Sequence, residues 1–265
     1  MHPQTQPVKA GMISLLVFAV AIAGLPLSPA RGAEASGSSS KPFATEELAQ
    51  LVAPVALYPD PLLAQVLMAS TYPLEVVQAD RWTKKNKELK GKALTAKLEK
   101  ENWDPSIKSL VNFPKVLDMM NKELEWTTKL GDAFIADQKK VMKAVQNLRG
   151  RARAEGKLKT TKQQKVIVQK ETQTIVIEPA KPNVIYVPSY NPVVVYGAWP
   201  YPAYPPYAVY PAGYYAGRAV AFGVGVATAA AWGYAWGGCR WGHGDIDINH
   251  NRNSNLNRNI HSRPQ

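Results

Sequence analysis

Apolar residues recur with helical spacing from residue 45 onward. The dipeptide Asp60-Pro61 is followed by apolar residues that share one helix face: Leu62, Leu63, Val66 and Leu67. Asp followed by Pro is a typical helix start, because Asp caps free backbone N–H groups and Pro suits the first helical position. The same device recurs at Asp104-Pro105. We therefore predict a helical domain over residues 45–160.

Two stretches of this domain resemble each other. Each has the order Asp-Pro, aromatic-Pro, Trp: Asp60-Pro61, Tyr72-Pro73 and Trp82, then Asp104-Pro105, Phe113-Pro114 and Trp126. The separation from Asp to Trp is 22 residues in both, although the aromatic-Pro step is shifted by three. Either the match is chance, since Asp-Pro is common at helix starts, or two related helix pairs pack in one bundle.

A longer helix is predicted from Gly131 to about Glu155. Its end and the residues after it carry five cations: Arg149, Arg151, Arg153, Lys157 and Lys159. Cations at a helix C-terminus complement the helix dipole and are commonly solvated. A surface that binds an anionic partner is the second interpretation of the same pattern.

The spacing of apolar residues along the chain changes after residue 164. Short β-branched runs recur every 8–10 residues, with Pro and Asn between the later ones: 166–168, 174–177, 184–187 and 193–196. This spacing predicts a small antiparallel β region over residues 161–197. Residues 198–217 are rich in Pro and Tyr, and we expect an extended spacer there.

Small residues dominate residues 218–241. No charge occurs between Arg218 and Arg240, and small residues fall at every fourth position: Ala219, Gly223, Ala227, Ala231 and Ala235. In a helix this spacing permits close packing, either in a membrane or between copies of the chain. The stretch contains no Leu or Ile, so a loosely ordered Gly/Ala segment is the alternative.

The last segment, residues 242–265, is rich in Asn. Asp or Asn stands at every second position from Asp245 to Asn259. As a strand, this segment would present a ladder of Asx side chains and support homo-oligomers. Asn and Asp are poor strand formers, so a disordered tail is the other interpretation.

The N-terminus has the order of a secretory signal peptide. Lys9 precedes the apolar run Met12–Leu25, and small residues follow up to Ala35. The run is shorter than the ~20 residues that a spanning helix needs. We predict a signal peptide over residues 1–35 and a linker over residues 36–44. The protein is then expected in the periplasm or cell envelope, with membrane association if residues 218–241 are embedded.

Four motifs in order resemble a known family. They read LVAPVALYPDPLLAQVLMASTYPLEVVQADRW, NWDPSIKSLVNFP, WTTKLGDAF and VIYVPSYNPVVVYG. Together they are similar to the bacterial exported family catalogued as domain of unknown function 3300, over roughly residues 45–200. The resemblance implies a bacterial envelope setting and brings no catalytic residue with it.

The net charge and the residues able to bind metal limit the classes of partner that we expect for this chain. The formal net charge of +12 favours an anionic envelope surface, either phospholipid or glycan, or another envelope protein. Export makes nucleic acid an unsuitable partner. The single Cys239 permits neither a disulfide within the chain nor a Cys-based metal site. His243, His250 and His261 lack the spacing of a helical zinc pair, so no metal and no cofactor are expected.

Four carboxylates are the candidates for catalysis: Asp60, Glu75, Asp80 and Asp104. Two of them across a groove would suit a periplasmic glycan-processing hydrolase. Asp60 and Asp104, however, have a structural explanation as helix caps, and Glu75 and Asp80 as acids of helix surfaces. The preferred prediction is an α+β envelope binding or scaffold protein: a helical bundle, a small β region and a low-complexity tail.

Overall fold

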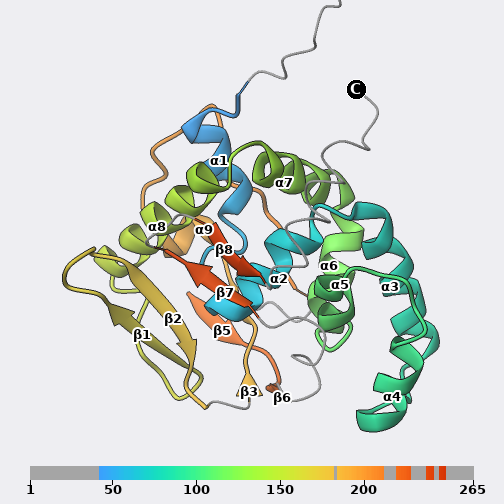
Figure 1. Ribbon diagram of the computed structural model, residues 1–265. Helices are drawn as coiled ribbons and strands as arrows, with labels where there is room; N and C mark the ends of the chain where they lie inside the picture. The colour runs from blue at the N-terminus through green and yellow to red at the C-terminus, as the bar shows by residue number, and fades with distance from the viewer. Residues whose placement is uncertain (1–41, 182–183, 212–218, 228–236, 242–244, 249–265) are drawn as a thin grey trace, which may run out of the picture. The chain divides into compact units, whose positions relative to one another are not determined.

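Helices form the first part of the chain and short antiparallel strands the second (Figure 1). The computed structural model describes residues 42–181, 184–211, 219–227, 237–241 and 245–248. The described helices are α1 (Thr45–Val52), α2 (Asp60–Ala69), α3 (Pro73–Lys85), α4 (Gly91–Leu98), α5 (Pro105–Leu110), α6 (Pro114–Lys122), α7 (Leu124–Ala136), α8 (Gln138–Ala154) and α9 (Pro192–Val195). The described strands are β1 (Gln164–Val168), β2 (Ile175–Pro179), β3 (Val184–Ile185), β4 (Pro188–Tyr190), β5 (Val220–Phe222), β6 (Val226–Ala227), β7 (Gly237–Arg240) and β8 (Asp245–Ile248). The predicted α+β class is confirmed.

The pairs α2–α3 and α5–α6 are built alike. A Pro lies in the first turn of all four helices. Tyr72 and Phe113, which precede α3 and α6, have nearly the same backbone angles, with φ −123° and ψ 58° against φ −119° and ψ 63°. α2 packs against α5, and α3 packs against α6. The predicted match of the Trp residues is wrong, because Trp82 lies in α3 whereas Trp126 lies in a third helix, α7.

The long helix predicted from Gly131 is two helices. α7 ends at Ala136, and the side chain of Asp137 accepts a hydrogen bond from the backbone N–H of Lys140 at 2.9 Å, which caps α8. Gly131 lies inside α7 rather than at a helix start. A Cβ atom there would lie 2.1 Å from the carbonyl oxygen of Ser70, so glycine permits the close approach of α7 to the end of α2.

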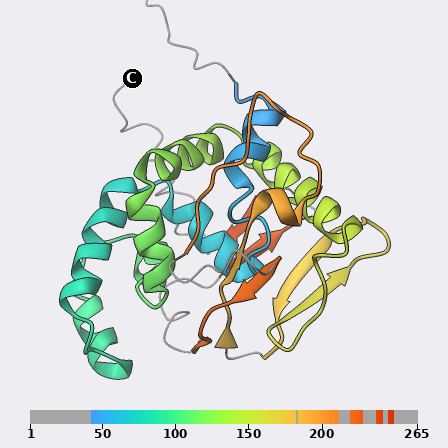
Figure 2. The same ribbon diagram turned by 180° about the vertical axis from the view of Figure 1, so that it is seen from behind.

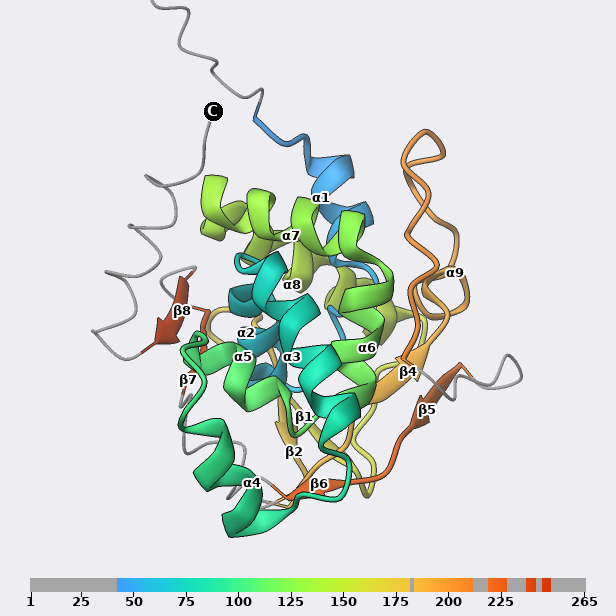
Figure 3. The same cartoon turned by 90° about the vertical axis from the view of Figure 1, so that its right-hand side faces the viewer.

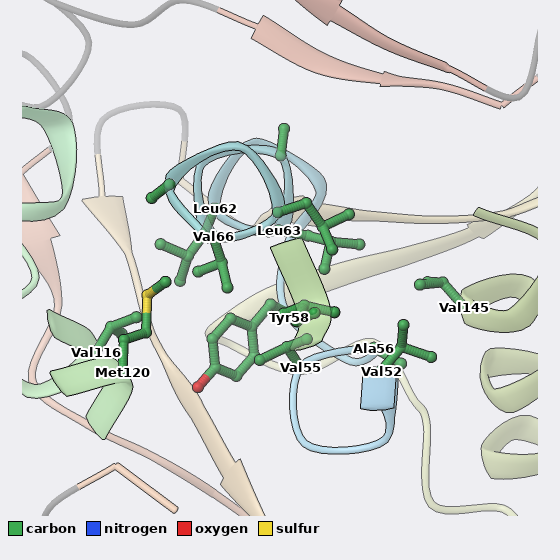
Figure 4. Packing of buried hydrophobic residues seen from close by; sticks show 14 of the residues in the cluster. Val52, Val55, Ala56, Tyr58, Leu62, Leu63, Val66, Val116, Met120 and Val145 are labelled. Atoms are coloured by element: carbon green, nitrogen blue, oxygen red, sulfur yellow. The ribbon is translucent and has the colours of Figure 1, made fainter. Parts of the chain in front are cut away.

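The turn between α1 and α2 lies in the core. Every residue from 51 to 60 is buried. Figure 4 shows Tyr58 and the α2 side chains between Val116 and Met120 of α6 on one side and Val145 of α8 on the other. Several backbone groups of the turn bond to one another, but others, such as the carbonyl oxygens of Ala53 and Tyr58, need partners from elsewhere in the chain.

The β region is a set of pairs rather than the predicted meander. β1 and β2 form the expected antiparallel hairpin, with Val166 opposite Ile177. β3 pairs with β6, and β4 with β5, so each partner strand comes from beyond residue 218. The strand predicted at 193–196 is wrong: residues 192–195 form α9, since Pro192 opens it and the Asn191 side chain accepts from Val193 N–H at 3.0 Å.

The helix that was one of the two interpretations of residues 218–241 is not formed where the structure describes the segment. Ala219 precedes β5, Gly223 follows it and Ala227 belongs to β6, while Ala231 and Ala235 lie outside the described residues. The pairing of β3 with β6 also explains why residue 225 is a glycine. A Cβ atom there would lie 2.5 Å from a methyl carbon of Val184. Among the described helices, none has the length and apolarity required to cross a membrane.

Strands β7 and β8 lie on the opposite side of α2 from β4 and β5 (Figure 3). β8 covers the start of the alternating Asx segment, so residues 245–248 are a strand. It pairs with β7, with Ile246 opposite Cys239, and Ile246 is buried. The rest of that segment lies outside the described residues.

Candidate functional site

Arg149 lies inside the protein and not on the predicted basic surface. Its side chain is fully buried, and one guanidinium nitrogen is 2.6 Å from Oδ1 of Asp60. The guanidinium also donates to the carbonyl oxygens of Ala56, Tyr58 and Ile175. These bonds satisfy the buried turn described above, so Arg149 has a structural role and cannot contact an external surface.

The same charge pair also contacts Trp241, the residue that follows β7. Trp241 donates its indole N–H to Oδ2 of Asp60 at 2.7 Å, and its ring centre lies 4.8 Å from the guanidinium carbon of Arg149. Asp60 is the first residue of α2 and its side chain does not cap that helix, contrary to the prediction. Its partners are instead Arg149, Trp241 and the N–H of Ile177.

Two buried tyrosines complete the support of the turn. The hydroxyl groups of Tyr190 and Tyr196 donate to the carbonyl oxygen of Ala53 at 3.0 and 2.8 Å, and Leu57 N–H donates to the Tyr190 hydroxyl. Burial raises the pKa of both tyrosines above the ordinary value, so both remain neutral donors. The stretch around residues 190–196 therefore stabilises the stretch around residues 51–61.

The other candidate carboxylates also bond to the protein. Asp104 accepts from Ser106 N–H at 2.7 Å and caps α5 as predicted. Glu75 accepts from the Asp104 N–H at 2.7 Å, and burial raises the pKa of its carboxyl. Asp80 is buried and is bonded to Lys84 and Asn121 at 2.7 and 2.6 Å. The structure thus brings Glu75 and Asp104 together and assigns a structural partner to each of the four carboxylates.

The remaining cations of the predicted basic surface differ in environment. Arg153, Lys157 and Lys159 are exposed, and Arg151 is half-buried. Residues two apart on a helix point to nearly opposite sides, which is why Arg149 faces the core and Arg151 does not. One terminal nitrogen of Arg151 donates to the carbonyl oxygen of Ala198.

Arg151 lines a pocket of about 290 Å³ between α1, α8 and the segment after α9. Its buried lining is apolar and its open side carries polar groups. The lining residues are Thr45, Ala49, Ala144, Asn147, Leu148, Arg151, Pro200 and Tyr201. We call this the Arg151 pocket. None of the four candidate carboxylates lines it.

The segment 198–211 forms one wall of the pocket and is more than the predicted spacer. In Figure 2 it rises beside α1 after leaving α9. The Gln50 side chain donates to the carbonyl oxygen of Pro205 at 2.6 Å, and the Trp199 indole donates to that of Tyr204 at 2.8 Å. The rings of Trp199 and Tyr201 are in edge contact, with centres 6.0 Å apart.

One donor of the Arg151 side chain has no acceptor. The Nε atom of Arg151 is buried, and no hydrogen-bond partner for it exists among the described residues. A buried donor without a partner costs about 1–3 kcal/mol, more when it carries charge. The charge of Arg151 makes it a candidate from the sequence, whereas Thr45, Asn147 and Tyr201 could not be predicted because they come from distant parts of the chain.

Comparison with known proteins identifies a relative and a family. The chain is 39% identical over 243 residues to "Uncharacterized protein YacH" of Escherichia coli (strain K12), an alignment that covers 80% of this chain and 38% of that protein. The chain therefore spans well under half the length of that relative. No solved structure matches it. The model of one family matches residues 44–265, and the chain belongs to that family, which is described as protein of unknown function (DUF3300).

Proposed function

We propose that this chain is an exported cell-envelope protein whose helical domain binds anionic envelope material through the Arg151 pocket. The observation that carries the proposal is that Arg151 lines a pocket that is also lined by an aromatic ring and polar side chains. A guanidinium presents N–H donors in a fixed fork that matches a carboxylate or a phosphate. The pocket therefore offers a contact for an anionic group within a concave site that can select a ligand by its shape.

The surrounding charge fits the same function. Arg153, Lys157 and Lys159 are exposed near the end of the same helix, and the whole chain carries +12. Exposed cations attract an anionic surface over a distance and add little to a specific contact at physiological salt. Arg151 would supply the specific part.

Support for binding over hydrolysis comes from the carboxylates. Asp60, Asp80 and Asp104 are buried and bonded to cations, amides or hydroxyls of the protein. General acid and base groups must reach a substrate, with two carboxyl groups about 5–10 Å apart across an open site. The Arg151 pocket contains no carboxylate.

The export part of the proposal has a direct test. Full-length chain produced in a Gram-negative bacterium should be found in the periplasmic or envelope fraction, and a version that lacks residues 2–35 should stay in the cytoplasm. Immunoblots of fractions with a cytoplasmic marker protein measure this. Equal retention of both versions in the cytoplasm would contradict export.

The binding part is tested by a matched pair of variants. We expect Arg151→Gln to weaken binding to anionic envelope material about tenfold or more, because a charge-assisted hydrogen bond contributes about 1.5–3 kcal/mol. Arg153→Gln removes the same charge from the same helix outside the pocket and should change binding less than about twofold at physiological salt. Co-sedimentation with phosphatidylglycerol vesicles and with an insoluble acidic glycan gives the affinities.

Equal losses in the two variants would show general electrostatic attraction and would contradict a role for the pocket. Absence of binding to both materials by the unmodified chain would contradict the proposed function itself. Thermal unfolding of each variant must match that of the unmodified chain, since Arg151 also holds Ala198.

A further inference from the structure

We infer that a second surface of the helical domain docks the protein on an anionic lipid bilayer. This surface is formed by residues 85–100, which run from the last residue of α3 to just beyond α4, and we call it the lysine arm. In Figures 1 and 3 the lysine arm lies at the lower end of α3, away from α7. It shares no residue with the Arg151 pocket, so the inference goes beyond the proposed function and does not depend on it.

Positive charge is concentrated on the lysine arm. Its 16 residues contain six lysines and two glutamates, so the arm carries +4 of the formal net charge of +12. None of the six lysines forms an ion pair with a described acidic residue, whereas Lys84, just before the arm, pairs with both Asp80 and Asp118. The charge of the arm is therefore available to an external anionic partner. All six lysines are exposed: Lys85, Lys87, Lys90, Lys92, Lys97 and Lys100.

The stability of α4 does not explain these charges. Lys90 stands at its N-cap without a side-chain cap hydrogen bond, Lys92 lies in its first turn, and that turn contains no acidic residue. The N-terminus of a helix is its positive end, so cations there destabilise the helix. The cations of α8 differ, because Arg151 and Arg153 lie in its last turn, where the dipole favours them. Such a conflict with local stability is expected where exposed residues serve a function.

Packing of Lys97 and Leu98 fixes the lysine arm to the domain. Leu98 is buried, and the Lys97 Nζ lies 5.9 Å from the ring centre of Trp82. Trp82 is also in edge contact with Trp103, with ring centres 6.0 Å apart, and the Trp103 indole donates to the side-chain oxygen of Gln78 at 3.1 Å. Lys97 thus anchors the arm, and we assign the bilayer contact to the other five lysines.

Lysine side chains suit a bilayer surface. Clusters of about four to eight basic residues on an exposed helix are typical of proteins that bind anionic lipids, and each one near the surface strengthens binding about fivefold. An ammonium group on a long apolar stem can follow headgroups at varying positions. Recognition of one carboxylate or phosphate in a fixed geometry favours the planar fork of Arg instead. The lysine arm contains six lysines and no arginine.

An acidic glycan fits the lysine arm less well. Binding sites for small rings are typically concave and hold aromatic and polar groups. The arm is a turn and a short helix at one end of α3 (Figure 3), and the Trp82 ring already contacts Lys97 and Trp103. Leu98 is buried and Leu94 is half-buried, so the contact with a bilayer is expected to depend on charge rather than on inserted apolar side chains.

Two triple variants that each remove three positive charges test the inference. Binding of the exported form of the full chain is measured by co-sedimentation with vesicles of phosphatidylglycerol and phosphatidylcholine in equal parts, at physiological salt. The arm variant should bind about 100-fold more weakly than the unmodified chain, and the control variant less than about threefold more weakly. The arm variant is Lys87→Gln, Lys90→Gln, Lys92→Gln, and the control variant changes exposed lysines of the β1–β2 region: Lys162→Gln, Lys165→Gln, Lys170→Gln.

Thermal unfolding shows whether the lysines are structural. The arm variant should unfold at the same temperature as the unmodified chain or at a higher one, because Lys90 and Lys92 oppose the dipole of α4. Clear destabilisation of the arm variant would assign the lysines to the fold and overturn the inference. Binding of the unmodified chain should also be lost at high salt and on vesicles of phosphatidylcholine alone, since the contact depends on charge.

The outcomes separate the inference from the proposed function. Equal losses in the arm and control variants would show an effect of net charge, and equal losses on vesicles and on an insoluble acidic glycan would show a general site for polyanions; either result overturns the inference. If vesicle binding depends on Arg151 and not on the lysine arm, the inference is overturned while the proposed function stands. Vesicle binding that Arg151→Gln retains and the arm variant loses supports the inference, and Arg151-dependent binding of the glycan then tests the pocket independently.

Discussion

Replacing Arg149 by Ala is expected to lower the free energy of unfolding by about 3–5 kcal/mol or to prevent folding, because breaking a buried ion pair leaves an uncompensated charge. Asp60 would keep only neutral partners in the core, and the carbonyl oxygens of Ala56, Tyr58 and Ile175 would lose a donor each. Urea unfolding followed by circular dichroism measures the effect.

Two controls make this prediction specific. Arg153→Ala removes an exposed Arg from the same helix and should change stability by less than about 0.5 kcal/mol. The double variant Arg149→Met, Asp60→Leu removes both charges together and should be less destabilised than Arg149→Ala alone. A loss in Arg149→Ala no larger than that in Arg153→Ala would contradict the structural role of the pair.

Gly131→Ala is expected to destabilise the protein by about 2 kcal/mol or more, within or above the usual range for overpacking. The new methyl group would lie 2.1 Å from the carbonyl oxygen of Ser70, which is backbone and cannot rotate away. α7 would have to move from the end of α2. The shift of the urea midpoint measures the loss.

Gly150 provides the matched control because it is also a helical glycine. A Cβ atom there meets nothing within 4 Å, and the residue is exposed in α8. Gly150→Ala should therefore stabilise the protein by up to about 1 kcal/mol, the difference in helix propensity between the two residues. A stabilising effect of Gly131→Ala, like that expected for Gly150→Ala, would mean that α7 does not lie against α2 as described.

The two sides of α8 carry arginines with different surroundings. One side of the helix carries Arg149 into the core, where it holds the turn between α1 and α2. The other side carries Arg151 to the pocket and the segment after α9. If the pocket binds a ligand as we propose, its attachment to a helix anchored in the core would hold its geometry without the ligand and reduce the entropy lost on binding.

The local sequence pattern was sufficient to predict the α+β fold class and much of the helical domain. Pro at the starts of α2, α3, α5 and α6 and the apolar spacing after each of them are properties of adjacent residues, and they hold in the structure. The hairpin β1–β2 is likewise local, since its strands are close in sequence. Family membership also followed from contiguous motifs and is confirmed.

Only the tertiary structure decided which cations are buried and where the pocket lies. Sequence alone gave Arg149 and Arg151 the same interpretation, but Asp60, 89 residues away, takes one of them into the core. The segment after residue 218 appeared as a separate tail, yet β5 and β6 pair with β4 and β3, and Trp241 reaches Asp60. Contacts between residues so far apart in the sequence form only when the chain folds, and the spacing of apolar residues along the chain does not predict them. For the same reason Thr45, Asn147 and Tyr201 meet only when α1, α8 and the segment after α9 have packed together.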